Sequence, residues 1–322
     1  MLLSLLLACA PAPAPTCDAA DDTLPLTAIQ ALGTHNSTHI EPELPLDPSH
    51  RYTQPPLPEQ LDRFGVRQLE LDLHYRDGAG FQVFHLPIID EETTCLALTT
   101  CLQEIRAWSD ANPCHAPILV WMEPKDEDAD FLSDDLLPLI DRQDELEATL
   151  LSVWPRERIF TPDDLRGDDP TLPEAIAARG WPALGEVRGR VMFAMLDDGE
   201  QRARYLERSA ALEGRLLFVD ADTPDDPFAA MFKMDDAVGD GELVRERVAA
   251  GFLVTSNADA ADEDDGGARF DATLAAGSHY LSSDRLLSDP PAAIPGGEPA
   301  RCNPISAPAG CAPADVEDLG GG

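Results

Sequence analysis

The sequence predicts an α/β fold, a (β/α)8 TIM-type barrel that is irregular in places. Its 322 residues suit one large barrel. Between Leu24 and Asp289, short apolar runs alternate with longer amphipathic stretches, and eight of the runs have the length of strands. Strands that alternate with helices form a parallel sheet covered by those helices, and eight such units close into a barrel.

The eight predicted strands are short and rich in apolar residues. They cover Ala28–Thr34, Val66–Leu73, Pro117–Glu123, Arg158–Phe160, Arg188–Met195, Arg215–Asp220, Gly251–Ser256 and His279–Ser283, of which the fourth has the weakest pattern. Amphipathic periodicity predicts helices over Cys101–Ala111, Phe131–Leu151, Glu200–Leu212 and Glu242–Ala250. A turn at Gly78 to Gly80 predicts that Phe81–His85 forms a hairpin that extends the second strand.

The two ends of the chain differ from the barrel in composition. Residues 1–8 are an apolar run that predicts a signal peptide and is too short to span a bilayer. The run ends in Leu6-Leu7-Ala8-Cys9, which resembles a bacterial lipobox. Residues 9–23 are therefore interpreted as the tether of a lipid-anchored cell-envelope protein, with a plain secretory signal as the alternative. Residues 290–322 form a Pro- and Gly-rich tail.

Cysteine usage fits an exported protein. Apart from Cys9, the chain has six cysteines, and an even number in an exported chain predicts disulfides. Cys302 and Cys311 lie close together in the tail and are expected to pair with each other. The pairing of Cys17, Cys95, Cys101 and Cys114 stays open.

The charge balance excludes one class of partner. The chain has 60 Asp and Glu against 23 Lys and Arg, a net charge of −37. Such a surface repels the phosphates of nucleic acids, so no nucleic-acid partner is expected. Lysines are scarce: Lys125 and Lys233 are the only two.

Polar side chains gather where the first three strands are predicted to end. Glu70 and Asp72 share one face of the second strand, Glu123 ends the third, and His35 and Asn36 follow the first. The carboxyl ends of barrel strands form the reactive rim. Carboxylates placed side by side need a counter-charge, which a hard divalent cation with oxygen ligands supplies. The alternative is a strand with one solvated polar face.

These residues together resemble the catalytic X region of the phosphoinositide-specific phospholipases C. The shared pattern is a His-Asn pair, Glu-x-Asp on the second strand, a second His thirteen residues later and a Glu on the third strand. Here the pattern reads His35-Asn36, Glu70 with Asp72, His85 and Glu123. The bacterial calcium-dependent members are more similar still, through segments at residues 33–37, 95–113, 123–126, 160–167, 180–182 and 275–284. The resemblance extends from Leu32 to Asp284.

The resemblance implies a calcium-dependent phosphodiesterase that cleaves phosphatidylinositol to diacylglycerol and a (cyclic) inositol phosphate. By that resemblance, calcium is bound by Asn36, Glu70, Asp72 and Glu123. His35 donates to the phosphoryl oxygen and His85 protonates the leaving alcohol. Lys125 contacts the substrate phosphate, or else pairs with Asp126.

One segment departs from the family pattern. After the seventh strand the family has a basic stretch with arginine, whereas Val254–Asp259 contains none. No basic cluster is present for ring phosphates, so unphosphorylated phosphatidylinositol is the expected substrate. The protein is expected to be a monomer without a transmembrane helix that meets this lipid at a membrane surface. Two alternatives remain at this point. One is another metal-dependent barrel phosphodiesterase, acting on glycerophosphodiesters or sphingolipids, and the other is a non-catalytic lipoprotein that binds lipid or calcium.

Overall fold

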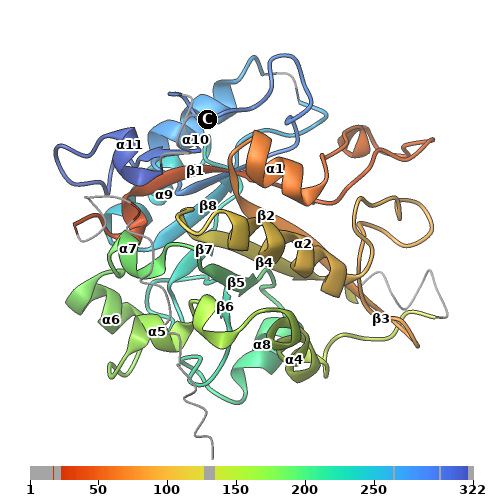
Figure 1. The fold of residues 1–322 in the computed structure, drawn as a ribbon, viewed down its shortest axis with the longest axis horizontal. Helices are drawn as coiled ribbons and strands as arrows, with labels where there is room; N and C mark the ends of the chain where they lie inside the picture. Colours follow the sequence, from red (N-terminus) through yellow and green to blue (C-terminus); the bar gives the residue numbers. More distant parts are fainter. Residues whose placement is uncertain (1–16, 18–22, 127–134, 264, 297–298, 318–322) are drawn as a thin grey trace, which may run out of the picture.

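Eight parallel strands form the centre of the molecule in the computed structural model, which describes residues 17, 23–126, 135–263, 265–296 and 299–317 (Figure 1). Their order around the barrel is β6-β5-β4-β2-β1-β9-β8-β7. A single parallel bridge, from Asp220 to Met231, joins the two end strands β6 and β7, so the barrel is nearly closed. The predicted (β/α)8 barrel is confirmed. The strands are β1 Ile29–Thr34, β2 Val66–Arg76, β4 Ile118–Pro124, β5 Val191–Met195, β6 Leu217–Val219, β7 Met231–Lys233, β8 Leu253–Asn257 and β9 Tyr280–Ser283.

Helices cover the outside of the barrel, which explains why β4 and β5 read as unbroken apolar runs instead of alternating. The α-helices are α1 Leu57–Arg63, α2 Leu98–Ala111, α4 Gln143–Val153, α5 Pro162–Arg166, α6 Leu172–Arg179, α7 Leu184–Val187, α8 Glu200–Leu206, α9 Gly241–Ala249, α10 Ala268–Ala276 and α11 Pro313–Val316. Three short 3-10 helices are η1 Leu26–Ala28, η2 Pro48–His50 and η3 Arg156–Arg158. Within the described residues, no helix has both the length and the apolar character needed to cross a membrane.

Two predicted elements were wrong. Arg158–Phe160 is not the fourth strand, because η3 occupies its start and Ile159 makes only one bridge to Val191. The eighth barrel strand is instead β7, whose three residues are too few to show a period. The helix predicted over Phe131–Leu151 begins only at Gln143, because Pro138 cannot continue a helix, and residues 131–134 lie outside the described part.

The predicted hairpin is confirmed. β3 (Gly80–Val83) pairs antiparallel with the end of β2 and extends to the right in Figure 1. After it comes the β3–α2 loop (residues 84–97), which lies beside the β1–α1 loop (residues 35–56). Backbone hydrogen bonds join the two loops, from Ile40 N to Glu92 O and from Thr94 N to Thr38 O. Both loops therefore stand together at the carboxyl ends of β1 and β2.

The tail is part of the fold. β10 (Ala300–Cys302) pairs antiparallel with β1, and Cys302 is joined to Cys311 as predicted. Glu317 reaches back to Arg67 of β2, whose guanidinium is fully buried against it. The other two disulfides are Cys17–Cys114 and Cys95–Cys101. Apart from Cys17 and Thr23, the predicted signal peptide and tether lie outside the described residues.

Candidate active site

Three carboxylates meet at the ends of β2 and β4. Alternation along β2 places Glu70 and Asp72 on the same face, and the register of the two strands pairs Asp72 with Glu123. One oxygen from each of the three side chains lies within 4.8 Å of the others. Glu70 and Asp72 are buried, whereas 27% of the Glu123 side chain is exposed. Burial raises the pKa of Asp72 well above its usual range, against the opposing effect of Lys125, and Glu123 and Glu70 add to the rise.

Both lysines of the chain face these carboxylates. Lys125 follows β4, and its Nζ lies 2.7 Å from Oε1 of Glu123 and 3.9 Å from Oδ1 of Asp72. Lys233 ends β7, and its Nζ donates to Oε2 of Glu70 and to Oδ1 of Asn257, each at 2.9 Å. Burial alone raises the pKa of Glu70, but Lys233 and then His35 outweigh it and hold that pKa well below its usual value. The centre therefore holds an ionised Glu70, with Asp72 and Glu123 beside it, between two ammonium groups.

Asn36 lies over Asp72 in a left-handed backbone conformation, with φ of 40°, which Asn adopts more readily than most residues. With its amide oriented to satisfy its neighbours, Asn36 donates to the Asp72 carboxylate and accepts from the hydroxyl of Tyr52. Tyr52 is buried and stacks on His39, with 4.3 Å between ring centroids. The amide thus already lies against one of the three carboxylates.

His35 stands between two acids at the end of β1. Its Nδ1 is 3.0 Å from Oδ1 of Asp284, and its Nε2 is 3.6 Å from Oε1 of Glu70. Partial burial lowers the pKa of His35, but Asp284 and then Glu70 raise it overall, to about 9. Asp284 is itself fixed, because its backbone N–H donates to Asp259 and its Oδ2 accepts from the N–H of Ala261. A protonated His35 held in this way can donate to an anionic oxygen.

His85 belongs to a second group, in which His39, His50 and His85 surround Asp90. Nδ1 of His85 lies 2.6 Å from Oδ2 of Asp90, an oxygen that is also 3.0 Å from Nε2 of His39 and 3.3 Å from Nδ1 of His50. Burial lowers the pKa of His85, against the raising effect of Asp90. Asp90 thus holds His85 through Nδ1 and not through Nε2.

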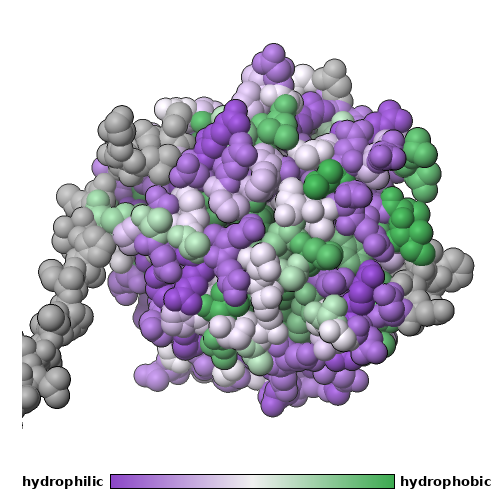
Figure 2. Space-filling model, turned by 45° about the vertical axis from the view of Figure 1, so that its right-hand side comes forward, coloured by the Kyte–Doolittle hydropathy of each residue, from purple (hydrophilic) through white to green (hydrophobic). Residues whose placement is uncertain are grey.

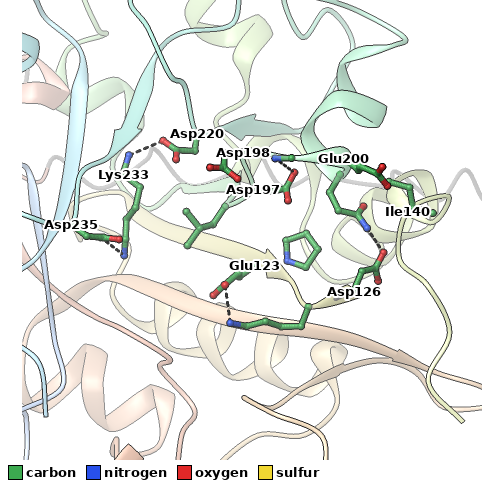
Figure 3. A pocket seen from close by; sticks show the side chains of 14 residues that line it. Glu123, Asp126, Ile140, Asp197, Asp198, Glu200, Asp220, Lys233 and Asp235 are labelled. Atoms are coloured by element: carbon green, nitrogen blue, oxygen red, sulfur yellow. Dashed lines mark hydrogen bonds and ion pairs between the residues drawn. The ribbon is translucent and has the colours of Figure 1, made fainter. Parts of the chain in front are cut away.

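A cavity of about 710 Å³ opens beside the carboxylates (Figure 3). Its wall is strongly acidic, since loops after β4, β5, β6 and β7 each contribute a carboxylate. Burial raises the pKa of one of these, Asp220, to about 7. The charged residues that line the cavity are Glu123, Lys125, Asp126, Asp197, Asp198, Glu200, Asp220, Lys233 and Asp235.

The structure brings most of the residues predicted for the site to this edge of the barrel. Glu70, Asp72 and Glu123 meet, Asn36 and His35 adjoin them, and His85 lies on the neighbouring loop. Lys125 contacts Glu123 and Asp72, while the Asp126 carboxylate accepts from the N–H of Leu139 instead.

Sequence reasoning missed Lys233, Asp284 and Asp90. The first had a usable signal, because it is one of only two lysines. Asp284 is 249 residues from His35 in the chain, so no local pattern joins the two.

A family model described as phosphoinositide phospholipase C, Ca2+-dependent, matches residues 75–304, more than two thirds of the chain. The chain belongs to this family. It is therefore a calcium-dependent phosphodiesterase of phosphoinositide lipids, and calcium is its cofactor. The match includes His85, Glu123, both lysines and Asp284, while His35, Asn36, Glu70 and Asp72 precede it. This membership favours the phospholipase C interpretation over both alternatives that the sequence left open.

Solved structures of two bacterial proteins share the fold of this phospholipase C. The calcium-dependent phosphoinositol-specific phospholipase C from Pseudomonas sp., in its apo form as a myoinositol complex, superposes with a TM-score of 0.63 at 17% identity, over 89% of this chain and 98% of the other. The Ca2+-dependent phosphatidylinositol-specific phospholipase C from Streptomyces antibioticus gives 0.57 at 20% identity, over 81% and 94%. No functionally curated protein shows significant sequence similarity to this chain.

Proposed function

We propose that the site cleaves unphosphorylated phosphatidylinositol, with calcium held by Glu70, Asp72, Glu123 and the amide oxygen of Asn36. For this, the Asn36 amide would turn over so that its oxygen, and not its NH2 group, faces Asp72. The observation that carries the proposal is the meeting of three carboxylates and an Asn within reach of one another, with His35 beside them. The donor set fits the ion, because calcium binds carboxylate and amide oxygens. Bound there, the ion supplies charge to the phosphate and lowers the pKa of a hydroxyl.

The two histidines have separate tasks in the proposed reaction. The inositol 2-hydroxyl attacks phosphorus, its proton passes to a carboxylate of the site, and the bond from phosphorus to the diacylglycerol oxygen breaks. His35, aligned by Asp284, donates a hydrogen bond to the phosphoryl oxygen as charge develops. His85, protonated on both ring nitrogens and aligned by Asp90, gives its Nε2 proton to the leaving oxygen and becomes neutral. Water then opens the cyclic phosphate.

The walls of the cavity support a head group without ring phosphates. Lys125 and Lys233 lie at the carboxylates, where the single phosphodiester would sit, and offer it positive charge. The remaining charged residues of the wall are acidic. Carboxylates accept hydrogen bonds from ring hydroxyls but repel further phosphate groups. We infer that Lys233 takes the place of the basic residues that are missing from Val254–Asp259, because its Nζ contacts Asn257 within that segment.

Exposed apolar side chains near the site support binding to a lipid surface. Leu44 and Leu46 in the β1–α1 loop are 82% and 74% exposed, and Ile88 in the β3–α2 loop is 66% exposed. Ile88 has a φ of 70°, which is strained for a β-branched residue. Figure 2 shows a largely hydrophilic surface with hydrophobic patches near its right edge. A protein of net charge −37 cannot rely on attraction to anionic lipid, so apolar contacts are the available means of docking.

Phosphorus NMR of the purified protein with calcium and phosphatidylinositol vesicles tests the function. A cyclic inositol phosphate should appear first. Cleavage of glycerophosphoinositol or sphingomyelin without any inositol phosphate would instead favour another barrel phosphodiesterase, and no cleavage at all would favour a binding protein.

A matched pair of variants tests the docking surface. Leu46→Ser should lower cleavage of lipid in vesicles but not of a soluble inositol phosphodiester. Leu151→Ser, at an exposed leucine of α4, should change neither rate. Equal losses for both variants on vesicles would contradict docking through the β1–α1 loop.

Export and anchoring complete the proposal. Three disulfides are typical of an oxidising compartment. We propose that Cys9 carries the lipid anchor and that the protein acts as a monomer. Mass spectrometry of the membrane-bound protein should find a lipidated Cys9 at the new N-terminus, and Cys9→Ser should release the protein from the membrane.

A further inference from the structure

The cluster of His39, His50, His85 and Asp90 has the composition of a transition-metal site and is separate from the three carboxylates. One ligand atom from each of His39, His85 and Asp90 lies within 4.8 Å of the others. His39 and Asp90 are 1% and 0% exposed, while His50 and His85 retain 15% and 16% and leave a route from solvent. Three imidazoles around one carboxylate oxygen are more than is needed to align a single catalytic histidine.

The hydrogen bonds of His39 carry the argument further. Its Nδ1 lies 3.0 Å from the carbonyl oxygen of Tyr52, and its Nε2 lies 3.1 and 3.0 Å from the two oxygens of Asp90. Both ring nitrogens thus face acceptors, but a neutral imidazole has one N–H. If Nδ1 donates to the backbone carbonyl, the lone pair of Nε2 points at a carboxylate. A cation between Nε2 of His39 and the Asp90 carboxylate removes that repulsion. A metal-binding His also usually donates its other N–H to a carbonyl, as Nδ1 of His39 would to Tyr52.

We propose that Nε2 of His39, Nδ1 of His85 and Asp90, with Nδ1 of His50 as a fourth ligand, bind one late first-row divalent ion such as Zn2+ or Co2+. Imidazole and carboxylate together suit these ions, whereas calcium prefers oxygen. Ligands at zinc bond lengths in a tetrahedron lie about 3.3 Å apart. The N···O separations of 2.6 to 3.3 Å between the histidines and Asp90 are close to that spacing. The ligand atoms of His39, His85 and Asp90 lie within 4.8 Å of one another, and His50, which is outside this group of three, would move toward it to complete the tetrahedron.

An ion bound by His39, His85 and Asp90 should inhibit catalysis, and added calcium should not reverse the inhibition. An ion on Nδ1 of His85 replaces the hydrogen bond from that nitrogen to Asp90, and it prevents His85 from becoming an imidazolium. Zn2+ should therefore inhibit lipid cleavage in saturating calcium, and added calcium should give no relief. Binding of the ion itself does not depend on the proposed function, so the two are tested separately.

The test is a Co2+ titration of the calcium-loaded protein followed by visible absorption. A Cys9→Ser chain is used, because Cys9 is the one cysteine outside the three disulfides. One equivalent of Co2+ should give the intense absorption of a four-coordinate ion, and Zn2+ should displace it. His39→Asn and His50→Asn should each weaken binding by about tenfold or more. Glu91→Gln, which removes the neighbouring acid, should leave the titration unchanged.

Two results would overturn the proposal. One is the absence of a Co2+ spectrum in a protein that still binds calcium. The other is an unchanged Co2+ affinity in His39→Asn and His50→Asn, with both variants shown to be folded by circular dichroism. In either case the cluster would be a protonated hydrogen-bond network only. Asp72→Asn, which alters the calcium site, should keep the Co2+ spectrum and so separates failure of the two sites.

Discussion

Nζ of Lys233 lies 2.9 Å from Oε2 of Glu70, although β7 and β2 are not neighbours in the barrel. The ion pair therefore crosses the mouth of the barrel from one wall to another. It is almost fully buried, with 3% of the Lys233 side chain and 1% of the Glu70 side chain exposed. A charge pair in this position partly neutralises a proposed calcium ligand and at the same time brings a cation to the place proposed for the substrate phosphate.

Lys233→Met separates these two effects. Removal of the ammonium lowers the positive potential at the carboxylates, so calcium should bind several-fold more tightly at pH 7.5. Cleavage at saturating calcium should fall about 10²-fold, because the phosphate loses a preorganised cation. Calorimetry measures the calcium affinity, and the lipid assay measures the rate of cleavage. A fall in both would mean that Lys233 acts by positioning Glu70 and not by contacting the phosphate.

Asp72→Asn should lower calcium affinity by about 10- to 100-fold, through the loss of one ligand charge. In EDTA the same variant should melt at a higher temperature than the wild type, because it no longer buries a carboxylate whose pKa is raised by burial and by Glu123 and Glu70. Calorimetry and thermal unfolding provide the measurements. Asp198→Asn, at an exposed acid on the cavity rim, is the control and should keep wild-type affinity.

His85→Ala should lose about 10²–10⁴ in rate on phosphatidylinositol, the usual scale of general acid help. On an analogue whose leaving alcohol is already acidic, such as a nitrophenol ester, the loss should be much smaller. His35→Ala should lose activity on both substrates, because the contact proposed for His35 is with the phosphoryl oxygen and not with the leaving group. Similar losses of His85→Ala on both substrates would remove it as the acid.

Asp90→Asn tests the pH dependence of stability in EDTA. Burial alone raises the pKa of Asp90, but hydrogen bonds from His39 and His85 lower it overall to about 2. The folded pKa lies below the unfolded value of about 3.9, so the stabilisation is fully present above about pH 5 and is lost as pH falls toward 2. Urea unfolding should show a difference from the wild type on the order of 2 kcal/mol at pH 6. That difference should shrink as pH falls from 4 toward 2, and a constant difference would contradict the assignment.

Glu317→Gln should destabilise the protein by about 3–5 kcal/mol, because it leaves the buried guanidinium of Arg67 without its counter-charge. The variant also weakens the acceptor for the N–H of Ala116, at 2.9 Å from Oε2 of Glu317. Urea unfolding measures the loss. Glu59→Gln is the matched control, since the ion pair of Glu59 with Arg63 lies on the surface and should be worth less than about 1 kcal/mol.

The sequence predicted the barrel well where the strands are long or fully buried. Strands β4 and β5 have apolar runs of five residues, and β2 alternates apolar and polar residues over Leu69–Leu73, so their type is marked locally. Strand β7 has three residues and follows a loop rich in Asp and Pro, so nothing local marks it. Arg158–Phe160 has only two apolar residues to suggest a strand, and Arg158 instead ends a 3-10 helix and donates from its Nε to Gly189 O.

The same distinction applies to the site. Glu70, Asp72 and Glu123 were found because alternation and strand ends are local properties. Their partners were not, because Asp284 and Lys233 reach the site through the closure of the barrel. Asp90 is only five residues after His85, yet its role depends on His39 and His50 from the other loop. Residues that contact the site from distant parts of the chain can be identified only from the tertiary structure.

The pairing of β1 with β10 governs when the molecule can fold. β1 also needs β9 as its parallel neighbour, and Arg67 needs a carboxylate 250 residues further along the chain. Since a chain is made from its N-terminus, β1 can pair with β2 early, but it lacks β10, and Arg67 lacks Glu317, until residues 299–317 have been made. The first strand of the barrel and the last described segment are thus stabilised by each other, and a chain cut before residue 299 should lack the buried ion pair and the edge strand that complete the fold.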